Sequence, residues 1–308
     1  MSPLWSRVPA SVRTVVSQIP QSRLAIRIAR SLTPNRLRIL AFHGVPDLHQ
    51  FELLLDEILS HYTAVSEDEV VASIEGDLEL PRLAAWFTFD DGLPSTLAAG
   101  PALARRGIRA TAFVCPSVLD TAEPLWFQTW EQAESEGLLE TPEFQAELSL
   151  SRMKTMPDHD RRKATEDLIQ RLGSRGVGEF EQASQAMLTD WVKVGHYVGN
   201  HTWDHPLLDQ CSPPSQREQV TRAHADLVGR GFCPRFLAYP NGNVAQGSVE
   251  AARELGYVGS VLFDHRLARI GSGDTHHLSR LRIDSDADTR RTSSILSGAH
   301  SAMLHLAL

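Results

Sequence analysis

Two short segments of this 308-residue chain carry side chains that could do chemistry together. The first is the apolar run Trp86-Phe87-Thr88-Phe89, which ends abruptly in Asp90-Asp91-Gly92 and is typical of a buried strand that opens into a site. The second is His201-Thr202-Trp203-Asp204-His205. Two imidazoles and one carboxylate can hold a divalent cation while the second carboxylate stays free. These groups together are what a metal-assisted hydrolase needs.

Each segment taken alone is a weak signal. Asp-Asp-Gly is a common solvated turn, and two histidines four residues apart share one face of a helix or turn without binding anything. A third segment, Phe236-Leu237-Ala238-Tyr239-Pro240-Asn241-Gly242, changes this interpretation. It is also a short apolar run that ends in residues typical of a loop. A second strand therefore ends in polar residues that could belong to the same site.

In this order, the patterns TFDDG, HTxxH and FxAYPxG resemble those of the polysaccharide deacetylase family, the NodB-homology group of carbohydrate esterases. The resemblance extends from about Arg36 to the C-terminus. The run from Ile39 to Val45 is similar to the first strand of the family, and Leu278-Ser279-Arg280-Leu281 to a late strand. The resemblance implies an α/β fold, an irregular (β/α) barrel with its site at the carboxyl ends of the strands. A chain of this length with 42% hydrophobic residues can bury one such core.

The resemblance also implies a metal centre. Asp91, His201 and His205 would bind one divalent metal, with Zn²⁺ as the expected ion. Asp90 would then be the general base, and a water on the metal would be the nucleophile. The product would be acetate released from an N-acetylated saccharide, either a cell-surface polysaccharide or a lipid-linked precursor.

The substrate would be bordered by residues from two strand ends. Tyr239, Pro240 and Asn241 come from the third segment, and a backbone N–H at or beside Asn241 would donate to the oxyanion because Pro240 has none. His43, at the end of the first strand, would face the substrate or support the site.

The chain departs from the family pattern at two points. Many members carry an arginine in the third segment that orients the base, and Ala238 occupies that place. Arg280 is a candidate replacement, since a guanidinium from another strand can bind a carboxylate through two hydrogen bonds, although a structural or surface role stays open. The general acid is unassigned. The late Leu-x-His pattern of the family has no counterpart here, and three histidines lie in that region as candidates or as loop residues: His265, His276 and His277.

The chain divides into a basic arm, residues 1–34, and a catalytic barrel, residues 35–308. Strands are expected near 38–43, 84–89, 109–115, 236–239 and 258–263. Helices alternate with them near 51–58, 94–106, 187–197, 216–230 and 249–255, so the sheet should be parallel. Between about 124 and 186 the sequence is charge-rich and helix-forming, with an exposed helix over 160–172. This helical insertion is either a scaffold or a wall that adds aromatic side chains to a sugar cleft.

The net charge of −8 conceals an asymmetry, because seven arginines and no acidic residue precede Asp47. In a helix, Arg23, Arg27 and Arg30 would share one face, and Leu24, Ile28 and Leu32 another. Such a helix either packs on its own domain with the arginines outward or docks on an anionic membrane. The acidic remainder has no extended basic surface, which argues against nucleic acid as a partner.

Three cysteines, Cys115, Cys211 and Cys233, are too few and too irregularly spaced for a disulfide framework or a zinc knuckle. The sequence shows no transmembrane stretch and no secretory signal. We therefore expect a cytoplasmic protein, with peripheral attachment to the inner membrane surface through residues 1–34 as an option.

Three functions remain open at this stage. The first is the metal-dependent deacetylase, and the second is a non-catalytic saccharide-binding module on the same fold. The third is a deformylase or deacylase of another sugar amide. A complete ligand set with a free base favours an enzyme, because a binding module needs neither.

Overall fold

The computed structural model describes residues 22–137, 139, 150–172, 180–271 and 273–306. Its centre is one parallel sheet of eight strands in the order β7-β6-β5-β4-β3-β1-β8, with β2 paired to β3 beside this path. The strands are β1 (Arg38–Phe42), β2 (Thr63–Val65), β3 (Ala84–Phe89), β4 (Thr111–Val114), β5 (Tyr197–Asn200), β6 (Phe236–Ala238), β7 (Gly259–Val261) and β8 (Leu281–Arg282). The α/β barrel expected from the sequence is confirmed.

The segment from Leu278 to Arg282 closes the sheet on itself. Leu278 forms a parallel bridge with Val261 of β7, and three residues later Leu281 pairs with Leu40 of β1. The same short segment therefore joins the last strand of one edge to the first strand of the other. This closure brings Arg280 into the interior of the barrel, where it is fully buried.

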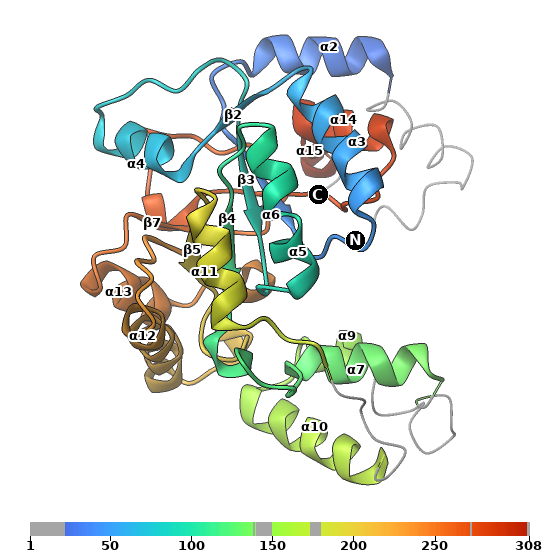
Figure 1. Cartoon of the computed structure of the whole chain (residues 1–308), viewed down its shortest axis with the longest axis vertical. Coiled ribbons are helices and arrows are strands. Elements are labelled where there is room, and N and C mark those ends of the chain that lie inside the picture. Colours follow the sequence, from blue (N-terminus) through green and yellow to red (C-terminus); the bar gives the residue numbers. More distant parts are fainter. Residues whose placement is uncertain (1–21, 138, 140–149, 173–179, 272, 307–308) are drawn as a thin grey trace.

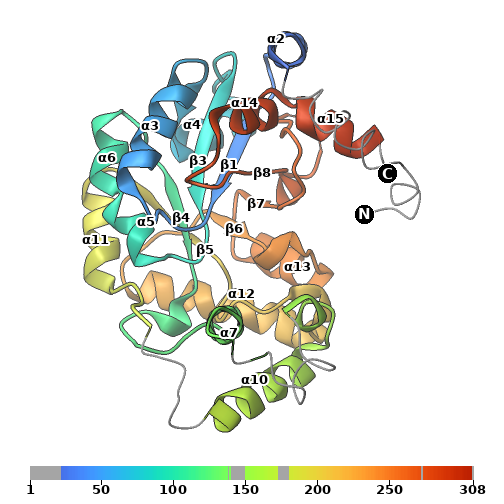
Figure 2. The ribbon, with the colours of Figure 1, turned by 90° about the vertical axis from the view of Figure 1, so that its right-hand side faces the viewer.

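Helices cover the outside of the sheet (Figures 1 and 2). Those of the barrel are α3 (Leu48–Leu59), α4 (Glu67–Glu75), α5 (Pro94–Ala98), α6 (Gly100–Arg105), α11 (Gln185–Lys193), α12 (Pro213–Gly229), α13 (Gln246–Glu254), α14 (Thr289–Ser297) and α15 (Ala299–Leu306). Because both faces of β1 and β3 are covered, every residue of these two strands is buried. Alternate side chains serve two cores. Leu40 and Phe87 pack toward the helices, whereas Ile39 and Trp86 fill the barrel.

Two helices differ from the sequence prediction. The helix expected over 94–106 is broken into α5 and α6, because Pro101 has no N–H to continue the first helix. The helix expected over 187–197 ends at Lys193, where Gly195 turns the chain with φ 97° and Tyr197 begins β5. Five strands and α-helices of the barrel were not predicted: β2, α4, β5, α14 and α15. The start of α4 was readable, since Ser66 and Glu69 form a capping box.

The charge-rich region between 124 and 186 contains α7 (Trp126–Ser135), α9 (Leu150–Met153) and α10 (Asp158–Leu172). Its residues 138, 140–149 and 173–179 lie outside the described part of the chain. A small apolar cluster of its own, with Trp130, Met153 and Leu168 at its centre, packs these helices together. They lie beyond one end of the barrel (Figure 1), the end at which the strands finish.

The opposite end of the barrel carries α2 (Arg23–Leu32), while residues 1–21 of the predicted arm lie outside the described chain. Ser22 caps the helix, since its hydroxyl accepts from the Ala25 N–H, and the helix packs on α14 and α15 with Ile26 buried. The face formed by Leu24, Ile28 and Leu32 is turned to solvent. Among the described residues, no helix has the length and apolar character needed to cross a membrane.

Candidate metal centre and active site

Asp90 and Asp91 lie where β3 ends in a sharp turn. The Asp90 N–H still donates to the Phe42 carbonyl of β1, at 2.9 Å, so Asp90 continues the strand. Asp91 and Gly92 then adopt left-handed φ values of 70° and 67°. The turn explains how two successive carboxylates reach one cavity, since neighbouring side chains on a straight strand point to opposite faces. Both aspartates are buried, with 3% and 6% of their surface exposed.

The two histidines follow β5 in a loop held by the barrel at its start. The His201 N–H donates to the Val114 carbonyl of β4, and the Asn200 side chain accepts from the Thr202 N–H at 2.7 Å. Thr202 and His205 both have positive φ, 69° and 59°, a conformation that L residues rarely adopt. The loop thus curls tightly enough to return His205 to the same cavity as His201.

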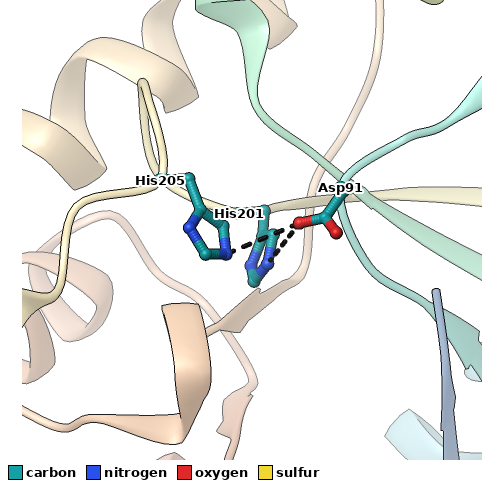
Figure 3. A group of neighbouring side chains, drawn as sticks. All are labelled: Asp91, His201 and His205. Carbon is teal, nitrogen blue, oxygen red and sulfur yellow. Dashed lines mark ion pairs between the residues drawn. The ribbon is translucent and has the colours of Figure 1, made fainter. Parts of the chain in front are cut away.

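Asp91, His201 and His205 form one cluster (Figure 3), whose possible ligand atoms all lie within 4.8 Å of one another. The Nε2 atoms of His201 and His205 are 3.4 and 3.5 Å from Oδ1 of Asp91. Two ligand atoms on a tetrahedral ion, each at about 2.1 Å, are separated by about 3.4 Å. Oδ1 of Asp91 is buried and has no hydrogen-bond partner among the described residues. Two imidazole nitrogens and one carboxylate oxygen at this spacing fit a divalent cation.

The protonation states also suit a cation. Nδ1 of His201 lies 2.8 Å from the Ala238 carbonyl, which can only accept, so this nitrogen carries a hydrogen and Nε2 is left as the ligand atom. Burial lowers the pKa of His205 to about 4, which keeps its imidazole neutral at neutral pH. Burial raises the pKa of Asp91, but the neighbouring His201 and His205 outweigh it and hold the pKa below its ordinary value.

Arg280 binds Asp90 with both ends of its guanidinium. Nη1 and Nη2 donate to the two carboxylate oxygens at 2.6 and 2.7 Å, and Nε donates to the Leu262 carbonyl at 2.7 Å. Burial raises the pKa of Asp90, but the charge of Arg280 outweighs it and holds the pKa below its ordinary value. The site therefore contains a carboxylate that is ionised at neutral pH.

The third segment contributes less than its sequence suggested. Tyr239 is fully buried, and its hydroxyl donates to the His276 carbonyl at 3.1 Å, so its side chain does not border the cavity. Pro240 is buried and begins a 3₁₀ turn over Pro240–Gly242. Asn241 lines the cavity and has φ 55°, and its N–H has no hydrogen-bond partner among the described residues.

A cavity of about 150 Å³ joins Asp90, Asp91 and the two histidines. His43, at the end of β1, lines it, and Phe263 lies against the His43 ring. Seven lining residues were missed by sequence reasoning or given no individual role: Leu207, Phe263 and Arg282 of the barrel, and Trp126, Phe127, Glu131 and Lys154 of the helical insertion. Within the insertion, only the aromatic residues Trp126 and Phe127 near its start indicated in the sequence that it could contribute to a cleft.

The three histidines considered as general acids lie elsewhere. His276 is buried and contacts the Ser260 hydroxyl at 2.9 Å, and His277 pairs with Asp274 on the surface. The ring of His265 lies against Phe263, and its carbonyl accepts from Ser301. None of the three is among the described residues that line the cavity.

Comparison with known proteins identifies the family. The family profile described as polysaccharide deacetylase matches residues 78–260, more than half of the 308 residues. The chain therefore belongs to the polysaccharide deacetylase family. Members of this family hydrolyse the amide bond of N-acetylated sugars.

Individual relatives are more distant. A peptidoglycan-N-acetylglucosamine deacetylase of Bacillus cereus is 25% identical over 84 residues, which cover 27% of this chain and 30% of that protein. The Streptococcus pyogenes deacetylase PplD, solved with acetate, is 18% identical with a TM-score of 0.59, covering 86% of this chain and 99% of its own. IcaB from Ammonifex degensii is 19% identical with a TM-score of 0.60, covering 85% and 97%. At these identities the two solved structures establish the fold.

Proposed function

We propose that the protein is a metal-dependent hydrolase that removes acetyl groups from a saccharide containing N-acetylglucosamine. The observation that carries the proposal is the cavity in which a buried, ionised Asp90 lies beside the set Asp91, His201 and His205. The name of the Bacillus cereus relative and the acetate bound to the Streptococcus pyogenes deacetylase support this choice of sugar and acyl group.

Asp90 acts as the general base in this proposal. Arg280 keeps the carboxylate ionised and fixes its orientation through two hydrogen bonds, so that it is ready to accept a proton from the attacking water. A divalent cation held by Asp91, His201 and His205 would supply an acidified water and polarise the acetamide oxygen. Asp91 thus binds the metal, whereas Asp90 accepts the proton.

Two further groups complete the reaction. Asn241 lines the cavity, and its unpaired N–H donates to the oxygen on which negative charge develops. His43 lines the cavity from β1 and lies close enough to Asp90 and Asp91 to lower their pKa values. We assign to His43 the transfer of a proton to the departing amine, a role for which the sequence offered only other histidines.

The test is acyl release from defined substrates. Purified protein, stripped with a chelator and then supplied with Zn²⁺, is incubated with oligomers of N-acetylglucosamine and with their N-formyl and N-butyryl analogues. We expect acetate release that depends on the metal and is lost in Asp90→Asn. Binding of the oligomers without any acyl release would instead identify a saccharide-binding module. Preferential release of formate or butyrate would correct the acyl group.

A further inference from the structure

The loop 202–206 is held from two sides. The barrel holds its first half, because the Gln219 side chain of α12 accepts from the N–H groups of Trp203 and Asp204, at 3.1 and 3.3 Å. The Trp203 carbonyl also accepts from the Ser117 N–H at 3.0 Å. The second half of the loop, which carries His205, meets the helical insertion.

Arg162 of α10 reaches the loop between the two histidines. Its Nη1 and Nη2 donate to the two oxygens of Asp204 at 2.7 and 3.0 Å, a two-point contact that fixes direction as well as distance. Asp158, one helical turn earlier, accepts from Nε of Arg162 at 2.7 Å and also pairs with Arg161. Hydrogen bonds to Asp204 raise the pKa of Arg162, so the guanidinium stays charged at neutral pH.

Trp126 and Phe127 of α7 hold His205 itself. The Trp126 indole N–H donates to the His205 carbonyl at 2.8 Å, and the Phe127 ring lies 4.7 Å from the imidazole. The guanidinium of Arg161, which is 1% exposed, stacks over the Trp126 ring at 4.8 Å. These contacts link α10, α7 and the histidine in one continuous chain of side chains.

His205 depends on these contacts more than His201 does. Nδ1 of His201 donates to a strand carbonyl, whereas Nδ1 of His205 is buried without a hydrogen-bond partner among the described residues. His205 also holds a positive φ of 59°, which persists only where the surroundings impose it. The usual hydrogen bond that fixes a metal-binding imidazole is thus replaced by contacts to its backbone and ring face.

We infer that α7 and α10 belong to the metal centre, with Arg162 and Trp126 as positioning residues that hold His205 in the ligand set. This inference rests on the proposed metal site. It assigns a role to the insertion that neither the scaffold nor the sugar-wall interpretation contains. The insertion would affect binding of the divalent cation by holding one of its ligands, His205, in place.

The test measures Zn²⁺ affinity by competition with a chromophoric chelator, without reference to turnover. We expect Arg162→Gln and Trp126→Phe each to weaken binding about 10- to 100-fold, the usual effect of losing a group that orients a ligand. Lys163→Gln, on the same helix, and Trp191→Phe, whose indole bonds the Tyr197 carbonyl in the barrel, are matched controls that should bind as wild type does. If Arg162→Gln does not fold, Asp204→Asn removes the same pair from its other side.

A double-mutant cycle separates this inference from the proposed function. Arg162→Gln should have no further effect on the residual Zn²⁺ affinity of a His205→Ala background, because the ligand it positions is gone. Unchanged Zn²⁺ affinity in His201→Ala and His205→Ala would refute the metal site itself. If those two variants lose Zn²⁺ but Arg162→Gln matches Lys163→Gln, the metal site stands and the positioning role is wrong.

A second, independent observation concerns α2. Leu24, Ile28 and Leu32 are 69%, 49% and 76% exposed, and Arg23 and Arg27 lie beside them on the same outward side. No acidic residue occurs in this helix. We propose that this face docks on an anionic membrane. The three apolar side chains would enter the interface, and the arginines would bind lipid phosphates. Figure 1 places α2 at the end of the barrel opposite α7, so a docked molecule would direct its cavity away from the bilayer.

Vesicle co-sedimentation tests the docking of the full chain. With vesicles of phosphatidylcholine and phosphatidylglycerol, Leu24→Glu/Ile28→Glu should bind about tenfold more weakly than wild type, and salt should weaken wild-type binding. Leu53→Glu, at an equally exposed leucine of α3, is the control and should bind normally. Binding of the double variant equal to that of wild type, equal binding to pure phosphatidylcholine, or a dimer that the double variant converts to monomer would each overturn the proposal.

Discussion

The two histidines of the candidate metal centre are held by different parts of the molecule. His201 directly follows β5, and its backbone and ring both bond to carbonyls of the neighbouring strands β4 and β6. His205 lies four residues further on and is held by long side chains of α7 and α10. One ligand is therefore placed by sheet register and the other by a separate layer of helices.

The comparison shows what each kind of support can do. Strand register is set by many cooperative backbone hydrogen bonds, so it places His201 and Asp91 with little freedom. The insertion relies on a partly exposed ion pair and one indole hydrogen bond, which are individually modest interactions. Changes in the insertion should therefore tune the metal centre, whereas changes in the barrel should destroy it.

Removal of the barrel-held ligand should have the largest effect. We expect His201→Ala to abolish stoichiometric Zn²⁺ binding, since it deletes a ligand and leaves Asp91 buried beside a void. Elemental analysis and chelator competition measure this directly. A variant that keeps wild-type affinity would show that the cluster of Asp91, His201 and His205 is not the metal site.

Loss of the base should stop turnover without touching the metal. We expect Asp90→Asn to lower the rate of acetate release by about 10²-fold or more, as is usual for a general base, while Zn²⁺ affinity stays near that of wild type. Metal content and circular dichroism serve as controls. Undiminished turnover in this variant would remove Asp90 from the mechanism.

Arg280 should affect both stability and pH dependence. Arg280→Ala leaves Asp90 buried without its partner, which costs about 3–5 kcal/mol of unfolding free energy. Because Arg280 holds the pKa of Asp90 below its ordinary value, its removal lets burial raise that pKa. The base works only when deprotonated and is lost as the pH falls through its pKa. The acid limb of the pH profile should therefore move to higher pH.

The measurement for Arg280 is kcat/KM between pH 5 and 9 with saturating metal, together with urea unfolding. Arg280→Lys keeps the charge and should shift the profile less than Arg280→Ala does. An unshifted acid limb in a folded Arg280→Ala protein would mean that this arginine has only a structural role.

The smallest effect is expected at Tyr239, where the pattern of the third segment and the structure disagree. Its hydroxyl bonds a buried carbonyl and not the cavity, so Tyr239→Phe should cost about 1 kcal/mol of stability and leave acetate release unchanged. Kinetics on N-acetylglucosamine oligomers and thermal unfolding test this. A large rise in KM would restore Tyr239 as a residue that borders the substrate.

The linear sequence was sufficient for much of this protein. Apolar runs ending in polar residues located β3 and β6 to within a residue, because a buried strand must be apolar on both faces and its end is where chemistry can begin. The same patterns singled out Asp90, Asp91, His201 and His205, which the fold brings into one cavity. The helix boundaries near Pro101 and Gly195 were predicted less accurately, because the expected helices were continued through these residues.

Only the tertiary structure decided which distant groups meet. Nothing local to Arg280 distinguishes it from a surface arginine, and its burial against Asp90 follows from the closure of the sheet between β7 and β1. The Tyr239 side chain points away from the cavity for reasons of packing that no pattern of residues expresses. The role inferred for the insertion depends on Arg162 reaching Asp204 across the loop, and such contacts depend on side-chain direction in the folded chain and not on spacing along it.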